Sequence, residues 1–182
     1  MASQTKVVML LILATAGAAL GLTLLFSFFW FLEADPDIVK DQAVMCKFSD
    51  KCPVGWSYYF GRCYLYNGAK LSWASAETFC QKFDAHLVSI HSENEYQQIK
   101  ALIRTYDPME NAAYIGLSDC QKAYQFFWSD GTKLGFTKWN PGQPDNENNN
   151  ERCVHINAST EKNWNDIPCD YTYASVCAKE SN

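Results

Sequence analysis

The sequence predicts an extracellular, disulfide-stabilised domain that contains both helices and short strands and follows an apolar N-terminal segment. The chain has 182 residues, which suits one compact domain with appendages. All eight cysteines lie beyond residue 45, as is typical of a disulfide framework formed in an oxidising compartment. Two stretches with helical spacing of apolar residues precede several short strand-like segments. A net charge of −5 without a basic block makes nucleic acid an unexpected partner.

The N-terminal part of the chain has the pattern of a membrane anchor. Residues 1–6 are a short polar tail whose only charged side chain is Lys6, and residues 7–32 contain no charged side chain. A span of about 20 apolar residues is enough to cross a bilayer. Acidic residues follow the run, and positive charge tends to stay in the cytoplasm. We therefore expect a single-pass type II cell-membrane protein, with residues 7–32 as a transmembrane signal anchor and the tail inside the cell.

A cleaved signal peptide is the alternative interpretation of this segment. Small residues at Ala16-Gly17-Ala18 offer a cleavage site, and cleavage would give a secreted protein. Residues 33–51 are polar and are predicted to form a stalk or linker that contains Cys46. The predicted globular domain covers residues 52–179.

Its first half is predicted to contain a hairpin and two helices. Aromatic residues on both sides of Gly61-Arg62 indicate a β-hairpin over residues 58–66. A helix capped by Ser72 should run to residue 83, and a second should start at the capping box Ser92-Glu93-Asn94-Glu95.

Residues 86–91, between the two helices, alternate like a strand. His86 and His91 would then point to opposite faces of that strand, so we do not expect them to form a metal or catalytic pair.

The second half is predicted to contain short strands and one long irregular segment. Strands are expected at 114–117, 126–128, 153–156 and 174–177, with Trp164 in a further strand. The segment from about residue 131 to residue 152 is too long for a passive connection, because structureless loops of this length are usually functional or disordered.

Five side chains that offer oxygen are concentrated in and after this segment: Gln143, Asp145, Glu151, Asn165 and Asp166. Hard cations such as Ca²⁺ take six to eight oxygen ligands, and the three carboxylates would give the site a charge of −1 with a divalent ion bound. Soft-metal ligands are absent from the pattern, which argues against zinc. A polar, turn-rich loop without an ion is the simpler alternative.

These residues resemble the calcium and sugar site of C-type lectin domains. Gln-Pro-Asp, a Glu six residues after the Asp, a Cys two residues further and then Trp-Asn-Asp carry the resemblance. It extends in order over residues 52–179 through further motifs: Cys-Pro-x-Gly-Trp, Trp-Ala-x-Ala-Glu-x-x-Cys, His-Leu-Val-Ser-Ile-His-Ser, Gly-Leu-Ser-Asp and Trp-Ser-Asp-Gly. Gln-Pro-Asp is similar to the galactose-type subgroup of this family.

The resemblance implies an α+β fold with two helices, two small antiparallel sheets and a long calcium-binding loop. It also implies three disulfides, Cys52–Cys63, Cys80–Cys177 and Cys153–Cys169, which spacing alone does not give. Cys46 and Cys120 are left over. They could pair with each other, or Cys46 could link two chains into a homodimer.

As a function, the resemblance implies calcium-dependent binding of glycans with terminal galactose or N-acetylgalactosamine. The five oxygen-bearing residues would hold both the ion and the sugar hydroxyls, with a cis bond before Pro144 as in similar domains. No aromatic residue follows Gln-Pro-Asp up to Asn150, and Trp164 is expected in the core. We therefore expect weak single-site affinity, about millimolar. Calcium affinity should fall in acid, because the carboxylates bind deprotonated.

Two further sites are weaker predictions. The counterparts of a second calcium site are Asp119, Ala123, Asn146 and Glu151, and the alanine lacks a ligand, so we expect that site to be empty or weak. Asn157 begins an Asn-Ala-Ser glycosylation sequon.

Two other classes of function are weighed against a lectin. An enzyme is not expected, because the acids match cation-ligand spacing and no nucleophile or metalloprotease motif occurs. The remaining alternative is a domain of the same kind that binds a protein, a lipid, or a mineral or ice surface.

Overall fold

The computed structural model describes residues 51–182. The expected tail, the apolar segment 7–32 and nearly all of the stalk, with Cys46, lie outside the described residues. Within residues 51–182, no helix has both the length and the apolar character needed to cross a membrane. The membrane anchor and the cleavable signal peptide both stay predictions.

The domain begins with the expected hairpin. Strand β1 (Ser57–Tyr59) pairs antiparallel with β2 (Arg62–Leu71). Gly61 lies in the turn at a φ of 84°, which glycine adopts without strain. Strand β2 is longer than the hairpin alone would require, because it also pairs along its length with the last strand, β8 (Tyr173–Glu180).

Both helices begin where their capping residues predict. Helix α2 (Trp73–Gln81) is capped by Ser72, and α3 (Glu93–Tyr106) is capped by Ser92, whose hydroxyl accepts a hydrogen bond from the Glu95 amide at 3.2 Å. The capping box is completed differently from the sequence prediction. The Glu95 carboxylate accepts from the His91 amide and from Arg62 and Tyr64, so it ties the helix start to the hairpin.

The strands join into one sheet, where the family resemblance implied two. Its order is β1-β2-β8-β4-β6-β7, and the remaining strands β3 and β5 pair with β8 and β4. The link is a short parallel pairing of Ala113 and Tyr114 with Ala174 and Ser175, which connects two otherwise antiparallel groups of strands. The bounds of the strands not given above are β3 (His86–Leu87), β4 (Ala113–Ser118), β5 (Phe127–Trp128), β6 (Cys153–Ala158) and β7 (Asn163–Ile167).

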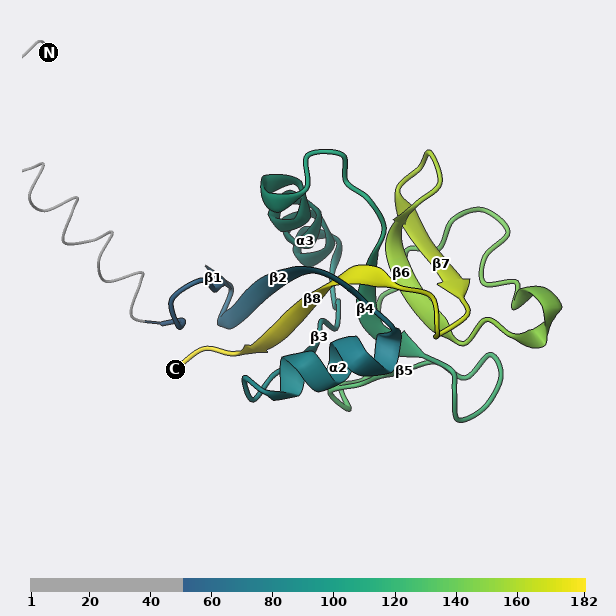
Figure 1. Cartoon of the computed structure of the whole chain (residues 1–182), viewed down its shortest axis with the longest axis horizontal. Helices are drawn as coiled ribbons and strands as arrows, with labels where there is room; N and C mark the ends of the chain where they lie inside the picture. Colours follow the sequence, from purple (N-terminus) through teal and green to yellow (C-terminus); the bar gives the residue numbers. More distant parts are fainter. Residues whose placement is uncertain (1–50) are drawn as a thin grey trace, which may run out of the picture. The chain divides into compact units, whose positions relative to one another are not determined.

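Two apolar clusters pack on the sheet, one with each helix. The larger cluster joins Tyr96, Ile99 and Ile103 of α3 to Trp164 and to inward residues of β4 and β6. The smaller one joins Ala76 and Cys80 of α2 to another set of strand residues. Figure 1 shows α3 and α2 on opposite sides of the strands. This packing fixes β6 and β7, which carry part of the candidate site.

Three disulfides brace the domain with the pairing that the resemblance implied: Cys52–Cys63, Cys80–Cys177 and Cys153–Cys169. Cys120 is exposed and forms no disulfide within the described residues. Its sulfur lies 3.7 Å from Sγ of Cys169. The Cys153–Cys169 bridge ties the start of β6 to the segment that follows β7.

The two ends of the described chain meet. The Asn182 amide donates a hydrogen bond to the Lys51 carbonyl at 3.2 Å, and the Ser181 amide donates to Gly61 at 2.8 Å. Figure 1 shows the C-terminus at one end of the domain and the loops beside β6 and β7 at the other.

Candidate metal and ligand site

The long irregular segment is held against β7 by backbone contacts. Trp139 forms an isolated bridge with Trp164. The Trp164 amide donates to Lys138 at 2.8 Å, and the Asn140 amide donates to Trp164 at 2.9 Å. The Gln143–Pro144 bond is cis, as expected. One short 3-10 turn, Glu147–Asn149, follows. This anchoring places residues 143–151 beside the Asn165-Asp166 pair of β7.

Three predicted ligands converge in this region. Carboxylate oxygens of Asp145, Glu151 and Asp166 lie within 4.8 Å of one another. We call these three residues the carboxylate cluster. Within residues 51–182, no lysine, arginine or histidine forms a salt bridge with any of them. Like charges this close repel unless a proton or a cation lies between them.

Backbone amides fix the positions of the cluster. The Asp166 carboxylate accepts from the Asp145 amide at 3.2 Å and from the Asn146 amide at 2.9 Å. The Glu151 carboxylate accepts from the Glu147 amide at 3.1 Å, while the Glu151 amide donates to the side chain of Asn146 at 3.1 Å. The loop is therefore folded around the carboxylates, and Asp166, at 1% exposure, is the most buried of the three.

The two amide ligands lie at the edge of the cluster. Oε1 of Gln143 accepts from the Asp145 amide at 3.1 Å, the same amide that donates to Asp166. Asn165 donates through its Nδ2 to the Asp166 carbonyl at 2.8 Å, which leaves its oxygen for another partner. All five residues predicted from the sequence therefore belong to one region of the surface.

Burial and mutual repulsion make the ionised forms of the cluster's carboxylates less favourable. The pKa of Glu151 is raised to about 7, mainly by burial and also by the negative charges of Asp166 and Asp145, while the hydrogen bond from the Glu147 amide opposes the shift. Burial also raises the pKa of Asp166 against three backbone hydrogen bonds. Carboxylate and amide oxygens with unbalanced negative charge fit a hard divalent cation.

No aromatic side chain is available to stack on a sugar from β7. Trp164 has no exposed surface and packs edge-on against Trp128, Phe136 and Trp139, with ring centroids 5.7–5.9 Å apart. The expectation that Trp164 belongs to the core is confirmed. Any sugar at the cluster would therefore be held mainly by the ion and by hydrogen bonds.

The residues at the counterpart positions of a second calcium site form contacts within the protein. Asp119 is 1% exposed, and its carboxylate accepts from Arg152 at 3.3 Å and from the Tyr124 amide at 2.5 Å. Oδ1 of Asn146 accepts a hydrogen bond from the backbone amide of Glu151. Arg152 places a positive charge beside Asp119. That the second site is empty or weak stays a prediction.

A polar groove next to the cluster was not predicted from the sequence. It has a volume of about 570 Å³, and its lining includes Gln143, Asn165, His155 and Asn157. We call it the β6 groove, because His155 and Asn157 lie on β6. Burial lowers the pKa of His155 to about 4, so its ring is neutral at physiological pH. Alternation along the strand places both side chains on one face, but nothing in the sequence shows that they lack partners.

The glycosylation sequon lies in this groove. Asn157 is 4% exposed, and its Nδ2 donates to the Asn111 carbonyl at 3.5 Å. Glycosylation at Asn157 stays a prediction.

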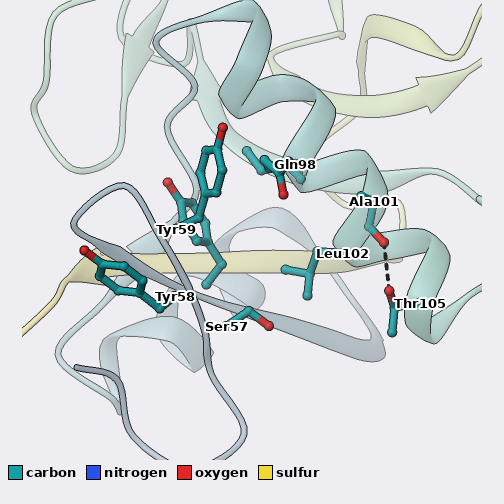
Figure 2. A pocket seen from close by; sticks show the side chains of 9 residues that line it. Ser57, Tyr58, Tyr59, Gln98, Ala101, Leu102 and Thr105 are labelled. Carbon is teal, nitrogen blue, oxygen red and sulfur yellow. Dashed lines mark hydrogen bonds between the residues drawn. The ribbon is translucent and has the colours of Figure 1, made fainter. Parts of the chain in front are cut away.

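A second cavity, of about 210 Å³, lies between β1 and α3 (Figure 2). Its lining contains no acidic side chain, histidine or cysteine: Ser57, Tyr58, Tyr59, Tyr64, Gln98, Ile99, Ala101, Leu102 and Thr105. Thr105 donates to the Ala101 carbonyl within the helix, as Figure 2 shows.

The lectin C-type domain model matches residues 69–179, which include every residue of the candidate site. The chain belongs to the C-type lectin domain family. Domains of this family commonly bind Ca²⁺ and are generally not enzymes.

Known relatives include both sugar-binding and ice-binding proteins. The chain is 43% identical to the type-2 ice-structuring protein of Osmerus mordax, over 76% of this chain and 79% of that protein. It is 38% identical to the lactose-binding lectin l-2 of Anguilla japonica, over 77% of this chain and 85% of that lectin. A solved Ca²⁺-dependent type II antifreeze protein in its Ca²⁺-free form matches with a TM-score of 0.66 and 39% identity, over 70% of this chain and 99% of that one.

Proposed function

We propose that this domain is a calcium-dependent lectin that prefers galactose-type sugars. The observation that carries the proposal is the convergence of Asp145, Glu151 and Asp166 with no cationic side chain of the described region between them. A bound Ca²⁺ would supply the missing charge and open coordination positions for two neighbouring sugar hydroxyls. Gln143 and Asn165 complete the set, and all five residues would both hold the ion and contact the sugar.

The sugar preference follows from the order of acid and amide around Pro144. Carboxylates only accept hydrogen bonds, whereas amides also donate through NH₂. The arrangement Gln143–Pro144–Asp145 therefore presents a donor and an acceptor in the order found in galactose-type lectins of this family. The similarity to a lactose-binding lectin supports this preference.

Removal of one carboxylate provides a sharp test of the ion site. In the oxidised domain, residues 46–182, Asp166→Asn should weaken calcium binding measured by titration calorimetry. We expect a loss beyond the about 10–100-fold that typically follows loss of an outer-shell partner, because this side chain is itself a ligand. Glu147→Gln is the matched control, since Glu147 is an exposed acid in the same loop outside the cluster. Equal losses in both variants would reject the assignment.

Retention on immobilised galactose, with mannose as the control, tests the sugar. Retention on galactose that is lost with a chelator would support the ion and the specificity together. Retention on mannose alone would be consistent with the ion site but would reject the galactose preference inferred from Gln143 and Asp145. Failure to bind either sugar at high ligand density would reject the lectin.

Ice binding is the second candidate function. It is favoured by the 43% identity to an ice-structuring protein and by the match to an antifreeze structure. Thermal hysteresis measured with and without Ca²⁺ distinguishes it from the lectin. Thermal hysteresis without retention on sugar would favour ice binding and reject the lectin proposal. Retention on sugar without thermal hysteresis would exclude ice as the ligand.

A further inference from the structure

The β6 groove begins where the carboxylate cluster ends. Gln143 and Asn165 belong to the candidate site and also line the groove. On the sheet, His155 of β6 lies directly opposite Asn165 of β7 in the antiparallel register. Directly opposed residues project to the same face, so the groove is continuous with the edge of the cluster.

Three buried polar atoms of β6 have no hydrogen-bond partner among residues 51–182: Nδ1 and Nε2 of His155 and Oδ1 of Asn157. Both side chains are more than nine-tenths buried, at 6% and 4% exposure. Native structures leave few such atoms unpaired, because a buried polar atom without a partner costs free energy. Two other lining residues bond to each other, since the Ser159 hydroxyl donates to Oδ1 of Asn140 at 3.1 Å.

The chemistry of the groove fits an uncharged polyhydroxyl group. A neutral imidazole offers one donor and one acceptor, and the amide oxygen of Asn157 accepts. Sugar hydroxyls both donate and accept, so they match this set. No lysine or arginine lines the groove, and Glu161 is its only charged lining residue. An anionic ligand would therefore have no countercharge. The volume of about 570 Å³ lies within the about 300–1,000 Å³ typical of ligand sites.

We propose that the β6 groove is a second sugar subsite, which binds the next residue of a glycan whose terminal residue occupies the carboxylate cluster. This inference rests on the proposed lectin function and adds that the ligand is at least a disaccharide. Two new hydrogen bonds to buried groups should increase affinity about tenfold over that of the monosaccharide.

The test compares methyl β-galactoside with lactose and N-acetyllactosamine, by titration of the full-length protein in detergent with Ca²⁺. Ala112→Phe fills the groove from a half-buried wall position without removing a polar group. Asn157→Ala removes the unpaired acceptor. Ala69→Phe makes the same steric change at an exposed position on β2 and is the control. Calcium affinity and melting temperature verify that each variant is folded.

We expect the disaccharides to bind about tenfold more tightly than methyl β-galactoside, with the gain lost in Ala112→Phe, reduced in Asn157→Ala and kept in Ala69→Phe. Equal binding of all three sugars by the unmutated protein would overturn the subsite and leave the lectin proposal intact. Absence of binding by any of them would reject both. A gain that survives in Ala112→Phe would also place the second residue outside the groove.

A second measurement concerns Asn157 itself. The subsite requires an unmodified side chain, because a glycan on Nδ2 would occupy the groove. The mass of the mature protein before and after treatment with a peptide N-glycosidase should therefore be unchanged. A loss of mass that is abolished by Ser159→Ala, which removes the sequon, would overturn the subsite.

Discussion

Glu151 is a residue whose protonation depends on what else is bound in the loop. Its pKa of about 7 exceeds the ordinary value near 4.5, so the ion-free folded domain favours the protonated form. Protonated Glu151 therefore stabilises the folded, ion-free domain. This contribution is fully present below about pH 4.5 and is lost as the pH rises through about 7, because the folded state binds more protons than the unfolded state in that interval. Calcium reverses the trend, since it binds the ionised form.

We therefore predict that the free energy of unfolding changes with pH in opposite directions with and without calcium. In metal-free buffer, this group should reduce the free energy of unfolding by about 1–3 kcal/mol between pH 4.5 and pH 7. With saturating calcium, stability should instead rise over the same interval. Urea unfolding at a series of pH values measures both curves.

Glu151→Gln provides the control for this prediction, because glutamine has a similar shape and does not titrate. Its metal-free curve should be flatter than that of the unmutated domain. Parallel curves would show that Glu151 does not titrate in this interval.

At this scale, residue type and spacing predicted the candidate ligands but not their surroundings. The oxygen-bearing side chains could be recognised because each is chemically suited to a hard cation. The pairing of Asp119 with Arg152 could not, because it depends on a contact across 33 positions of the chain. The lack of hydrogen-bond partners for the His155 ring nitrogens and for Oδ1 of Asn157 could not be predicted either, because it depends on which residues of the folded domain lie beside β6.

At the scale of the elements, strand β4 packs closely against its neighbours at Gly116. A Cβ at Gly116 would lie 2.5 Å from the Leu87 carbonyl oxygen and 2.8 Å from Oγ of Ser129. The backbone cannot shift freely, because the Gly116 amide donates to Val88 and its carbonyl accepts from Ser129, both at 2.8 Å. Strand β4 lies between β8 and β6, so its displacement would reach the groove.

We predict that Gly116→Ala lowers the free energy of unfolding by about 1–3 kcal/mol, as overpacking of a filled interior does. Gly135→Ala is the comparison, because no atom lies within 4 Å of a Cβ at that position. Its effect should stay within about 0.5 kcal/mol. Thermal unfolding of both variants tests the difference, and equal destabilisation would contradict the packing argument.

The helices were predictable from local signals, whereas the sheet was not. Ser72 and Ser92 cap their helices through bonds to residues three positions away, which a linear pattern contains. The joining of the strands into one sheet depends on the pairing of Ala113 with Ala174, which are 61 positions apart by number. Short apolar strands carry no signal for such partners, so family resemblance gave two sheets and the backbone shows one.

For the molecule as a whole, a disulfide that encloses a longer stretch of chain should contribute more, with a logarithmic dependence on that length. Cys80–Cys177 closes a separation of 97 residues, and Cys52–Cys63 closes one of 11. In the chain-entropy model, these constrain the unfolded state by about 4–5 and about 3 kcal/mol respectively.

We predict that the double variant Cys80→Ala and Cys177→Ala is less stable in urea than Cys52→Ala and Cys63→Ala. Both should be made in a Cys120→Ser background, because the Cys120 sulfur lies near Cys169 and could exchange with that bridge. A larger loss of stability on removal of Cys52–Cys63 would show that packing around each disulfide, and not chain entropy, determines how much it stabilises the domain.

The meeting of Lys51 with Asn182 has a practical consequence. Because residues 51 and 182 lie away from β6 and β7 (Figure 1), a biotin or affinity tag at residue 182, or at the start of a domain that begins at residue 51, should leave the candidate site unobstructed. Many copies attached in this way would present their sites toward solvent in a common orientation. A sensor chip coated with such copies would detect a weak glycan through simultaneous contacts, provided that the glycan carries several identical branches.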